Sequence, residues 1–362
     1  QETPGSEPYG VIFLAKTLRA LKSLNVSKNQ MATKDTGDAL GEMLKHNTVL
    51  THLDASDNGP GFAAGIAAGI TTNQSLVSLN LSDNDIRAEG TKAFTEAFKN
   101  NQTITKLDMS SNNMSFSSDW EDMSSVISDA IRDSIPTMRA LTSLDLRRNA
   151  LCTAAGGEAI RDILTDNDTL QHLDVSDNIE ESCTAYSYKT LCIMMFRPVL
   201  YAQNIADGLM TNRALTSLKL SNNNLEELAG KAFADALKAN SVLKELDVAN
   251  NLPKNRWGEV IRSEDGPGFV RELAVGMSTN GALTSLNLSN NRILTNNVGK
   301  ALAEALKQNS MLKELDLSGN IDDGRGYGIS FHGADGPGFA QEFAGGLGAN
   351  GALATITFGD KQ

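Results

Sequence analysis

The 362-residue sequence is poor in aromatic residues, which make up 5% of it, and it has only eight prolines and three cysteines. Large rings therefore cannot dominate the core, and Leu, Ile, Val and Ala must supply most of it. Three cysteines, Cys152, Cys183 and Cys192, are too few for a disulfide scaffold. Two interpretations stay open: a bridge between Cys152 and Cys183, or reduced thiols in a cytosolic protein, which we prefer.

Positive charge is also scarce. The chain has 32 Lys and Arg against 44 Asp and Glu, a net charge of -12. Nucleic acids and anionic lipids both require a basic surface, so neither is an expected partner. There is no signal peptide and no apolar run long enough to span a bilayer. The charge instead favours a protein partner with a basic surface.

Catalytic and metal-binding motifs are missing as well. The sequence contains no Walker, G-x-S-x-G, kinase or H-E-x-x-H motif, and no Cys or His pair with zinc spacing. His52 and His172 occupy equivalent places in the repeats described next, but four repeats separate them. We therefore predict no catalytic, cofactor or metal site, and we expect that the protein is not an enzyme.

One unit is repeated along the chain, and residues 281–309 show it most clearly. Leu286 and Leu288 alternate with polar residues, which predicts a short strand with one buried face. Leu302 and Leu306 follow at helical spacing. A single strand and helix cannot bury their own apolar faces, so copies of the unit must stack on one another.

The copies share two landmarks. Strand-opening apolar residues are Leu21, Leu50, Leu76, Ile104, Leu141, Leu170, Leu215, Leu243, Leu283, Leu312 and Leu353. The asparagines that follow each strand are Asn29, Asn58, Asn84, Asn112, Asn149, Asn178, Asn223, Asn251, Asn291 and Asn320. We predict a structural role for these asparagines, because a side-chain amide can bond the unpaired backbone groups where the chain turns.

We expect a single domain, 1–362, of about ten to eleven repeats, with an N-terminal arm at 1–9 and a partial first repeat at 10–20. Neither end has a polar capping repeat, so the sequence is expected to be a processed chain or a fragment. Alternate repeats are longer, with insertions between strand and helix near 113–137, 179–204, 252–266 and 321–336. Because the strands stack in parallel, these insertions should lie along one rim.

Helices are expected over 90–101, 230–240 and 299–309, each with Gly at its start and Asn at its end. Three of the other repeats enter the helix through Gly-Pro-Gly-Phe, preceded by Asn58, Asp265 or Asp335. Proline suits the first helical turn, and the side chain before it can accept free backbone N–H groups. We predict that these three residues cap their helices.

The strand and helix patterns of 10–358 resemble the ribonuclease-inhibitor class of leucine-rich repeats, which includes the arrays of NOD-like receptors and of the GTPase-activating protein of Ran. The resemblance implies an α/β leucine-rich-repeat horseshoe solenoid, with a parallel sheet on the concave face and helices on the convex face. Members of the class mostly bind proteins inside cells, but the fold does not select the partner. The long insertions depart from the class pattern.

The residue between the second and third strand leucines should point to the concave face. It is acidic in most repeats, namely Asp54, Asp108, Asp145, Asp174, Asp247 and Asp316. Serines on both sides of this column are also expected to face out. Neighbouring carboxylates about 5 Å apart repel by only about 1 kcal/mol in water. Three interpretations stay open: a solvated polar ladder, a surface for a basic partner, and a site for a cation such as calcium.

The insertions hold residue types that anchor protein interfaces. We predict partner contacts for Trp120, Tyr186, Tyr188, Arg256, Trp257, Arg325 and Tyr327. The alternative is that these rings cover the edge of the core, which we prefer for the apolar insertion at 179–204.

The sequence therefore favours a non-enzymatic scaffold that binds a protein through its acidic concave face and the rim that carries the insertions. One alternative is a GTPase-activating or other regulatory array, with Arg256 or Arg325 acting on the partner. Another is a structural subunit of a larger, membrane-associated assembly. We predict a cytoplasmic location, although triplets at Asn73, Asn101 and Asn167 match the pattern for N-linked glycans.

Overall fold

The computed structural model describes most of the chain. The described ranges are 20–99, 101–114, 124–179, 198–252, 268–320 and 335–359. The chain divides into two compact units, Gln1–Leu151 and Cys152–Gln362, which we describe one at a time. The prediction of a single domain over 1–362 stays a prediction.

Each unit contains one parallel sheet of short strands. The first unit contains β1 Ser23–Asn25, β2 His52–Asp54, β3 Ser78–Asn80, β4 Lys106–Asp108 and β5 Ser143–Asp145. The second unit contains β6 His172–Asp174, β7 Ser217–Lys219, β8 Glu245–Asp247, β9 Ser285–Asn287, β10 Glu314–Asp316 and β11 Thr355–Thr357. Within a unit each strand pairs with the next one in the chain and keeps the same register.

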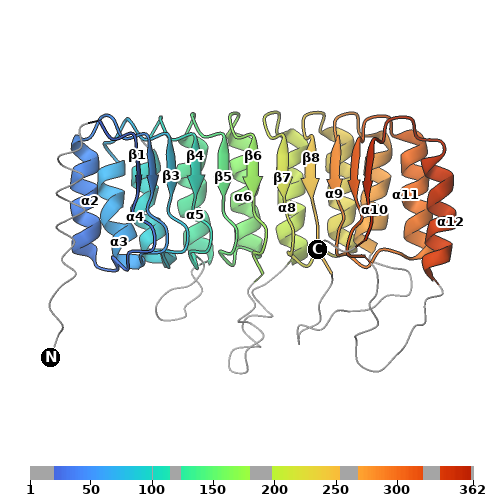
Figure 1. The fold of residues 1–362 in the computed structure, drawn as a ribbon, viewed down its shortest axis with the longest axis horizontal. Helices are drawn as coiled ribbons and strands as arrows, with labels where there is room; N and C mark the ends of the chain where they lie inside the picture. Colours follow the sequence, from blue (N-terminus) through green and yellow to red (C-terminus); the bar gives the residue numbers. More distant parts are fainter. Residues whose placement is uncertain are drawn as a thin grey trace, which may run out of the picture. The chain divides into compact units, whose positions relative to one another are not determined.

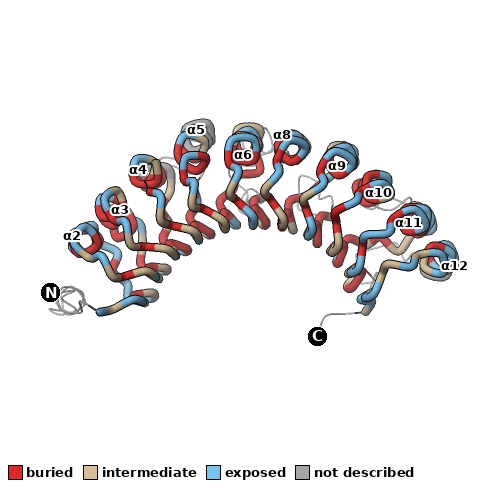
Figure 2. Tube along the Cα trace, turned by 90° about the horizontal axis from the view of Figure 1, so that it is seen from above, coloured by how far each residue is buried: buried red, intermediate tan, exposed pale blue. Residues whose placement is uncertain are grey.

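A helix follows almost every strand (Figure 1). The first unit has α2 Lys34–His46, α3 Pro60–Ile70, α4 Arg87–Lys99 and α5 Ser124–Ser134. The second unit has α6 Ala154–Asp166, α8 Pro198–Thr211, α9 Glu227–Ala239, α10 Gly268–Thr279, α11 Asn296–Gln308 and α12 Asp335–Leu347. In each unit the strands lie on the inner side of the curve and the helices on the outer side (Figure 2). This confirms the predicted α/β solenoid class.

The core lies between the two layers. The central strand leucines, such as Leu286 of β9, are buried, and Leu302 and Leu306 of α11 meet them from the other side. Each of these three side chains is at most 1% exposed. Burying a leucine of this kind contributes roughly 1.5–3 kcal/mol, which is why the apolar spacing predicts the fold so well.

The asparagines that follow the strands have the predicted structural role. In Asn84, the side-chain Nδ2 donates to the carbonyl oxygens of Ala55 and Leu81, at 3.0 and 2.9 Å. Its Oδ1 accepts the backbone N–H of Asn58 at 2.9 Å. Each such asparagine therefore links its own turn to that of the preceding repeat, in surroundings where unpaired polar groups would be costly.

A second asparagine column closes the helices, and the sequence did not indicate its role. In Asn73, Nδ2 donates to the carbonyl oxygen of Leu44 at the end of α2, at 2.8 Å. Its Oδ1 accepts the N–H of Leu76 at 2.8 Å. The three glycosylation triplets begin in this column, and Asn73, Asn101 and Asn167 are only 1–2% exposed. Such buried amides cannot carry glycans in the folded chain.

Two local predictions are wrong. Asn58 does not cap α3, because its Oδ1 accepts the N–H groups of Asn29 and Met31 in the preceding repeat. Proline does begin that helix, as expected. Asp265 lies outside the described residues, and the side chain of Asp335 is not described. The helices at 90–101, 230–240 and 299–309 each begin three residues earlier than expected, which places their glycines, Gly90, Gly230 and Gly299, one turn inside them.

Candidate functional site

The predicted acidic column lies at the last residue of each strand and is half-buried. In the first unit Asp54, Asn80, Asp108 and Asp145 are consecutive partners in the sheet. Asp108 and Asp145 are therefore neighbours, as predicted. Asp174, the third predicted neighbour, belongs to the second unit, where Lys219, Asp247, Asn287 and Asp316 follow it in register.

Each carboxylate accepts a hydrogen bond from the backbone N–H group two residues later in the chain. Oδ1 of Asp108 accepts the N–H of Ser110 at 2.9 Å, and Oδ1 of Asp247 accepts the N–H of Ala249 at 2.9 Å. Asn80 makes the same bond to Ser82 at 2.9 Å. Asparagine and aspartate are thus equivalent for the turn, so the negative charge is not needed for local structure.

We predicted that the serines after the strands face outward as part of the concave wall, and this prediction is wrong for several of them. Ser82, Ser110 and Ser318 are buried, each at most 8% exposed. The hydroxyls of Ser56 and Ser110 instead donate to the preceding aspartate, at 2.7 Å in both cases. These hydroxyls belong to the turn and do not line a binding surface.

Cations neutralise part of the column. Arg147 bonds the carboxylate of Asp145 through Nε and Nη2, with Nη2 at 2.8 Å. Lys219 lies 3.7 Å from the carboxylate of Asp174. Among the described residues no ion pair within 4 Å involves Asp54, Asp108 or Asp247. The column is therefore less uniformly acidic than the sequence predicted.

Asp108 is the member whose ionisation the fold resists. Burial raises the pKa of its carboxyl above the usual value, and the hydrogen bonds from Ser110 only partly oppose this shift. The nearby charge of Asp145 adds to the increase in pKa. Removing the charge from Asp108 should therefore not harm the fold.

Sequence reasoning missed two carboxylates that complete an acidic patch in the second unit. Glu245 and Glu314 are exposed at the first positions of β8 and β10, and Ser285 of β9 lies in register between them. Asp247 and Asp316 occupy the third positions of the same strands. We call Glu245, Asp247, Glu314 and Asp316 the acidic strand face. The repeated Glu-Leu-Asp sequence was the signal that could have revealed it.

The predicted insertion residues, namely Trp120, Tyr186, Tyr188, Arg256, Trp257, Arg325 and Tyr327, lie outside the described residues. In each unit the strands end and the helices begin at the same edge of the sheet (Figure 1). The described residues on both sides of each insertion therefore lie at that edge, which is consistent with the predicted rim. The contacts predicted for the seven side chains stay predictions.

Metal and thiol chemistry find little support in the described part of the chain. It contains no group of three or more His, Cys, Asp and Glu side chains that could hold a metal ion. Cys152 is a free, buried thiol, and burial raises its pKa well above the usual value. The thiol is therefore unreactive in the folded state. The cation interpretation of the aspartate column stays a prediction.

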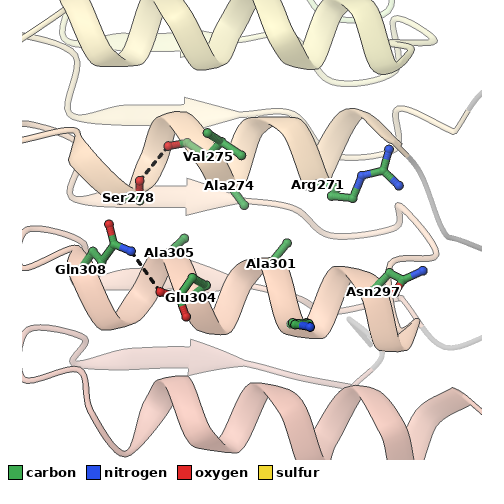
Figure 3. Close-up of a pocket in the computed structure, with 10 residues that line it drawn as sticks. Arg271, Ala274, Val275, Ser278, Asn297, Ala301, Glu304, Ala305 and Gln308 are labelled. Atoms are coloured by element: carbon green, nitrogen blue, oxygen red, sulfur yellow. Dashed lines mark hydrogen bonds between the residues drawn. The ribbon is translucent and has the colours of Figure 1, made fainter.

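A groove on the helix side is the second candidate site (Figure 3). It is an open groove of about 630 Å³ between α10 and α11. Its walls are Arg271, Ala274, Val275 and Ser278 from α10, and Asn297, Lys300, Ala301, Glu304, Ala305 and Gln308 from α11. Alanines and Val275 form its middle, whereas charged and polar groups lie toward its two ends.

Comparison with known proteins agrees with the architecture. The leucine-rich repeat family matches residues 72–94, 100–115 and 308–320. No curated protein matches the chain. None of the helices in the described ranges is long and apolar enough to cross a membrane.

Two solved structures are similar at low identity. A complex of Rad7 and Elc1 in yeast matches at 17% identity and a TM-score of 0.41, covering 98% of this chain and 84% of that one. Actin-binding site 2 of leiomodin-1 matches at 17% identity and a TM-score of 0.30, covering 57% of this chain and 91% of that one. At these scores the architecture is judged from the chain's own strands and hydrogen bonds.

Proposed function

Because the chain is a leucine-rich repeat protein, we propose that it is a non-enzymatic scaffold whose strand face binds a protein partner. Stacked repeats of this kind form extended inner surfaces that are generally used for binding proteins. On most strands the outward side chains are polar and half-buried or exposed, although Ser217 of β7 is buried, and the central leucine packs into the core. The strand face is thus an open, rigid and polar surface.

The acidic strand face carries the proposal. Glu245 and Glu314 project from strands that are separated by one intervening strand, roughly 10 Å apart. The exposed residues just before them, Lys244 and Lys313, place positive charge at the same, amino-terminal end of these strands. A partner segment with Lys or Arg over the carboxylates and an acidic residue over the lysines would complement this pattern. Asp54, Asp108, Asp145 and Asp174 are proposed as contacts of the same kind in the other strands.

The predicted insertion residues complete the proposal. Trp120, Tyr186, Tyr188, Arg256, Trp257, Arg325 and Tyr327 would supply the apolar anchors that a charged strand face lacks. Charge mainly sets selectivity and association rate, while aromatic and arginine anchors contribute most of the affinity.

We also propose a cytoplasmic location. An unpaired thiol at Cys152 suits a reducing compartment. The triplets at Asn73, Asn101 and Asn167 offer no counter-argument, because these three asparagines are buried and structural. After expression in a secretory host, peptide mapping should find no glycan at these three positions.

The test neutralises the acidic strand face without disturbing its turns. Glutamate becomes glutamine and aspartate becomes asparagine at all four positions, because asparagine already makes the same turn bond at Asn287, to Ser289 at 3.0 Å. A matched control removes four exposed carboxylates on the helix side with the same chemistry: Glu158, Asp207 and Glu342 within helices and Glu226 just before α9.

The strand-face variant, the control variant and the wild type are each used for affinity purification from cell extract, followed by mass spectrometry. One enriched protein is then purified, and its affinity is measured directly. Exposed ion pairs contribute roughly 0.2–1 kcal/mol each, so neutralising the four carboxylates of the strand face should weaken that affinity about 4- to 900-fold. The control should bind like the wild type. Equal binding by the strand-face variant would remove the acidic face from the proposal.

A further inference from the structure

The helices of the second unit are packed in pairs, and glycines make the pairs close. A Cβ atom on Gly276 of α10 would lie 2.4 Å from the Cα of Ala234 in α9. A Cβ atom on Gly346 of α12 would likewise lie 2.4 Å from the Cα of Ala303 in α11. Contacts this short are possible only without the side chain. The pairs α9–α10 and α11–α12 are thus in backbone contact, and the groove lies between them, along α10 and α11.

The groove has a positively charged end. Arg271 and Lys300 lie in the amino-terminal halves of α10 and α11, beside Asn297. In α9 the equivalent lysine, Lys231, pairs with Glu227 four residues earlier at 3.4 Å. In α11 the residue four positions before Lys300 is Asn296, so this pair is not formed. Among the described residues no carboxylate lies within 4 Å of the Lys300 ammonium group.

Arg271 is only loosely neutralised. Its Nη2 lies 3.6 Å from Glu227 and 3.8 Å from Glu272, longer than a good charge-assisted hydrogen bond. One helical turn beyond Lys300, Glu304 supplies a negative charge, which is shared with Lys307 at 3.4 Å. The groove is therefore polarised along its length, with an unsatisfied positive charge at the amino-terminal end.

An exposed apolar residue lies in the middle of the groove. Val275 is 53% exposed, whereas the residue at the equivalent place in α8 is Asp207. Beside it on α10, Ala274 points toward Ala301 and Ala305 of α11, and these small side chains leave space (Figure 3). A valine exposed over a floor of alanines suits an apolar side chain from another molecule.

We propose that this groove binds an amphipathic helical segment of a partner protein, with apolar side chains on Val275, Ala301 and Ala305 and an acidic residue on Arg271 and Lys300. A groove between two helices of 12 and 13 residues matches a helix of similar length, about 20 Å. The groove is open along its outer side, so it cannot enclose an acyl chain as a lipid pocket would. This surface is distinct from the strand face, and its test does not depend on that proposal.

The experiment uses the full chain and a designed fluorescent peptide of about 14 residues. The peptide has an Ala and Leu stripe at helical spacing, two Glu residues in one terminal turn and no other charge. A matched peptide carries Lys in place of both Glu residues. Fluorescence anisotropy measures binding to the wild type and to the variants Val275→Asp, Lys300→Glu and Lys92→Glu. Lys92 is exposed on α4, and its variant controls for the change in net charge.

We expect saturable binding of the Glu peptide that weakens about tenfold or more in Val275→Asp and Lys300→Glu but less than about twofold in Lys92→Glu. Lys300→Glu should also bind the Lys peptide better than the wild type does. Circular dichroism melts check that all variants are folded; Val275 is exposed, and aspartate already occupies its place in α8. Equal binding by all variants, no saturable binding below about 1 mM, or saturable binding of laurate in place of the peptide would each overturn the proposal.

Discussion

The strongest prediction concerns Asn223, in the asparagine column that joins the repeats of the second unit. Its Nδ2 donates to the carbonyl oxygens of Val175 at 2.9 Å and Leu220 at 3.1 Å. Its Oδ1 accepts the N–H of Asn178 at 2.9 Å. The residue is 0% exposed, so water cannot replace these partners.

Replacing Asn223 with alanine removes all three bonds. The carbonyl oxygens of Val175 and Leu220 keep the bonds that they accept from the side chains of Asn178 and Asn251, at 2.8 and 3.0 Å, whereas the buried N–H of Asn178 loses its acceptor. An unsatisfied buried polar group costs roughly 1–3 kcal/mol. The other two lost bonds contribute about 0.5–1.5 kcal/mol each, so we expect Asn223→Ala to lower the free energy of unfolding by about 2–6 kcal/mol, a large fraction of the 5–15 kcal/mol typical of a domain. Neighbouring repeats stabilise one another, so the loss should spread beyond one repeat.

The variant Asn223→Asp keeps the acceptor oxygen of the side chain but removes the amide group that donates two hydrogen bonds. The carboxylate can still accept the N–H of Asn178, but it faces two carbonyl oxygens without a proton to share. This variant should be destabilised at neutral pH and partly recover in acid, when the carboxyl is protonated. Urea unfolding followed by circular dichroism measures both variants. Gln341→Ala, at an exposed position of α12, is the control. A loss below about 1 kcal/mol for Asn223→Ala would refute the assigned role.

Three further predictions test other features. The raised pKa of Asp108 means that ionisation opposes folding, so Asp108→Asn should stabilise the protein at neutral pH. That gain should disappear as pH falls below both its folded and unfolded pKa values, which urea titrations across pH would show. Gly346→Ala should cost about 1–3 kcal/mol because a Cβ would meet Ala303, whereas Gly345→Ala, with nothing within 4 Å, should stabilise α12 by about 0.5–1 kcal/mol in thermal melts. With the other two cysteines replaced by serine, Cys152 should react with a disulfide reagent only after unfolding; rapid labelling of folded protein would contradict its burial.

The one-dimensional pattern was sufficient for the architecture. Leu286, Leu302 and Asn291 recur in equivalent form along the chain, and each repeat packs mainly on its neighbours, so local spacing predicts strand, helix and turn without knowledge of distant contacts. The aspartates were also correctly placed on the strand face, because alternation along a strand decides which way a side chain points.

The spacing of residues in the sequence could not predict which atoms of neighbouring repeats bond to one another. Asn58 was expected to cap its own helix, yet its oxygen bonds to the preceding repeat. Asn73 begins a glycosylation triplet but closes α2. The acidic strand face exists because register brings Glu245 and Glu314 to either side of Ser285. Such contacts depend on how neighbouring repeats are aligned and on how closely their backbones approach, and both are properties of packing in three dimensions.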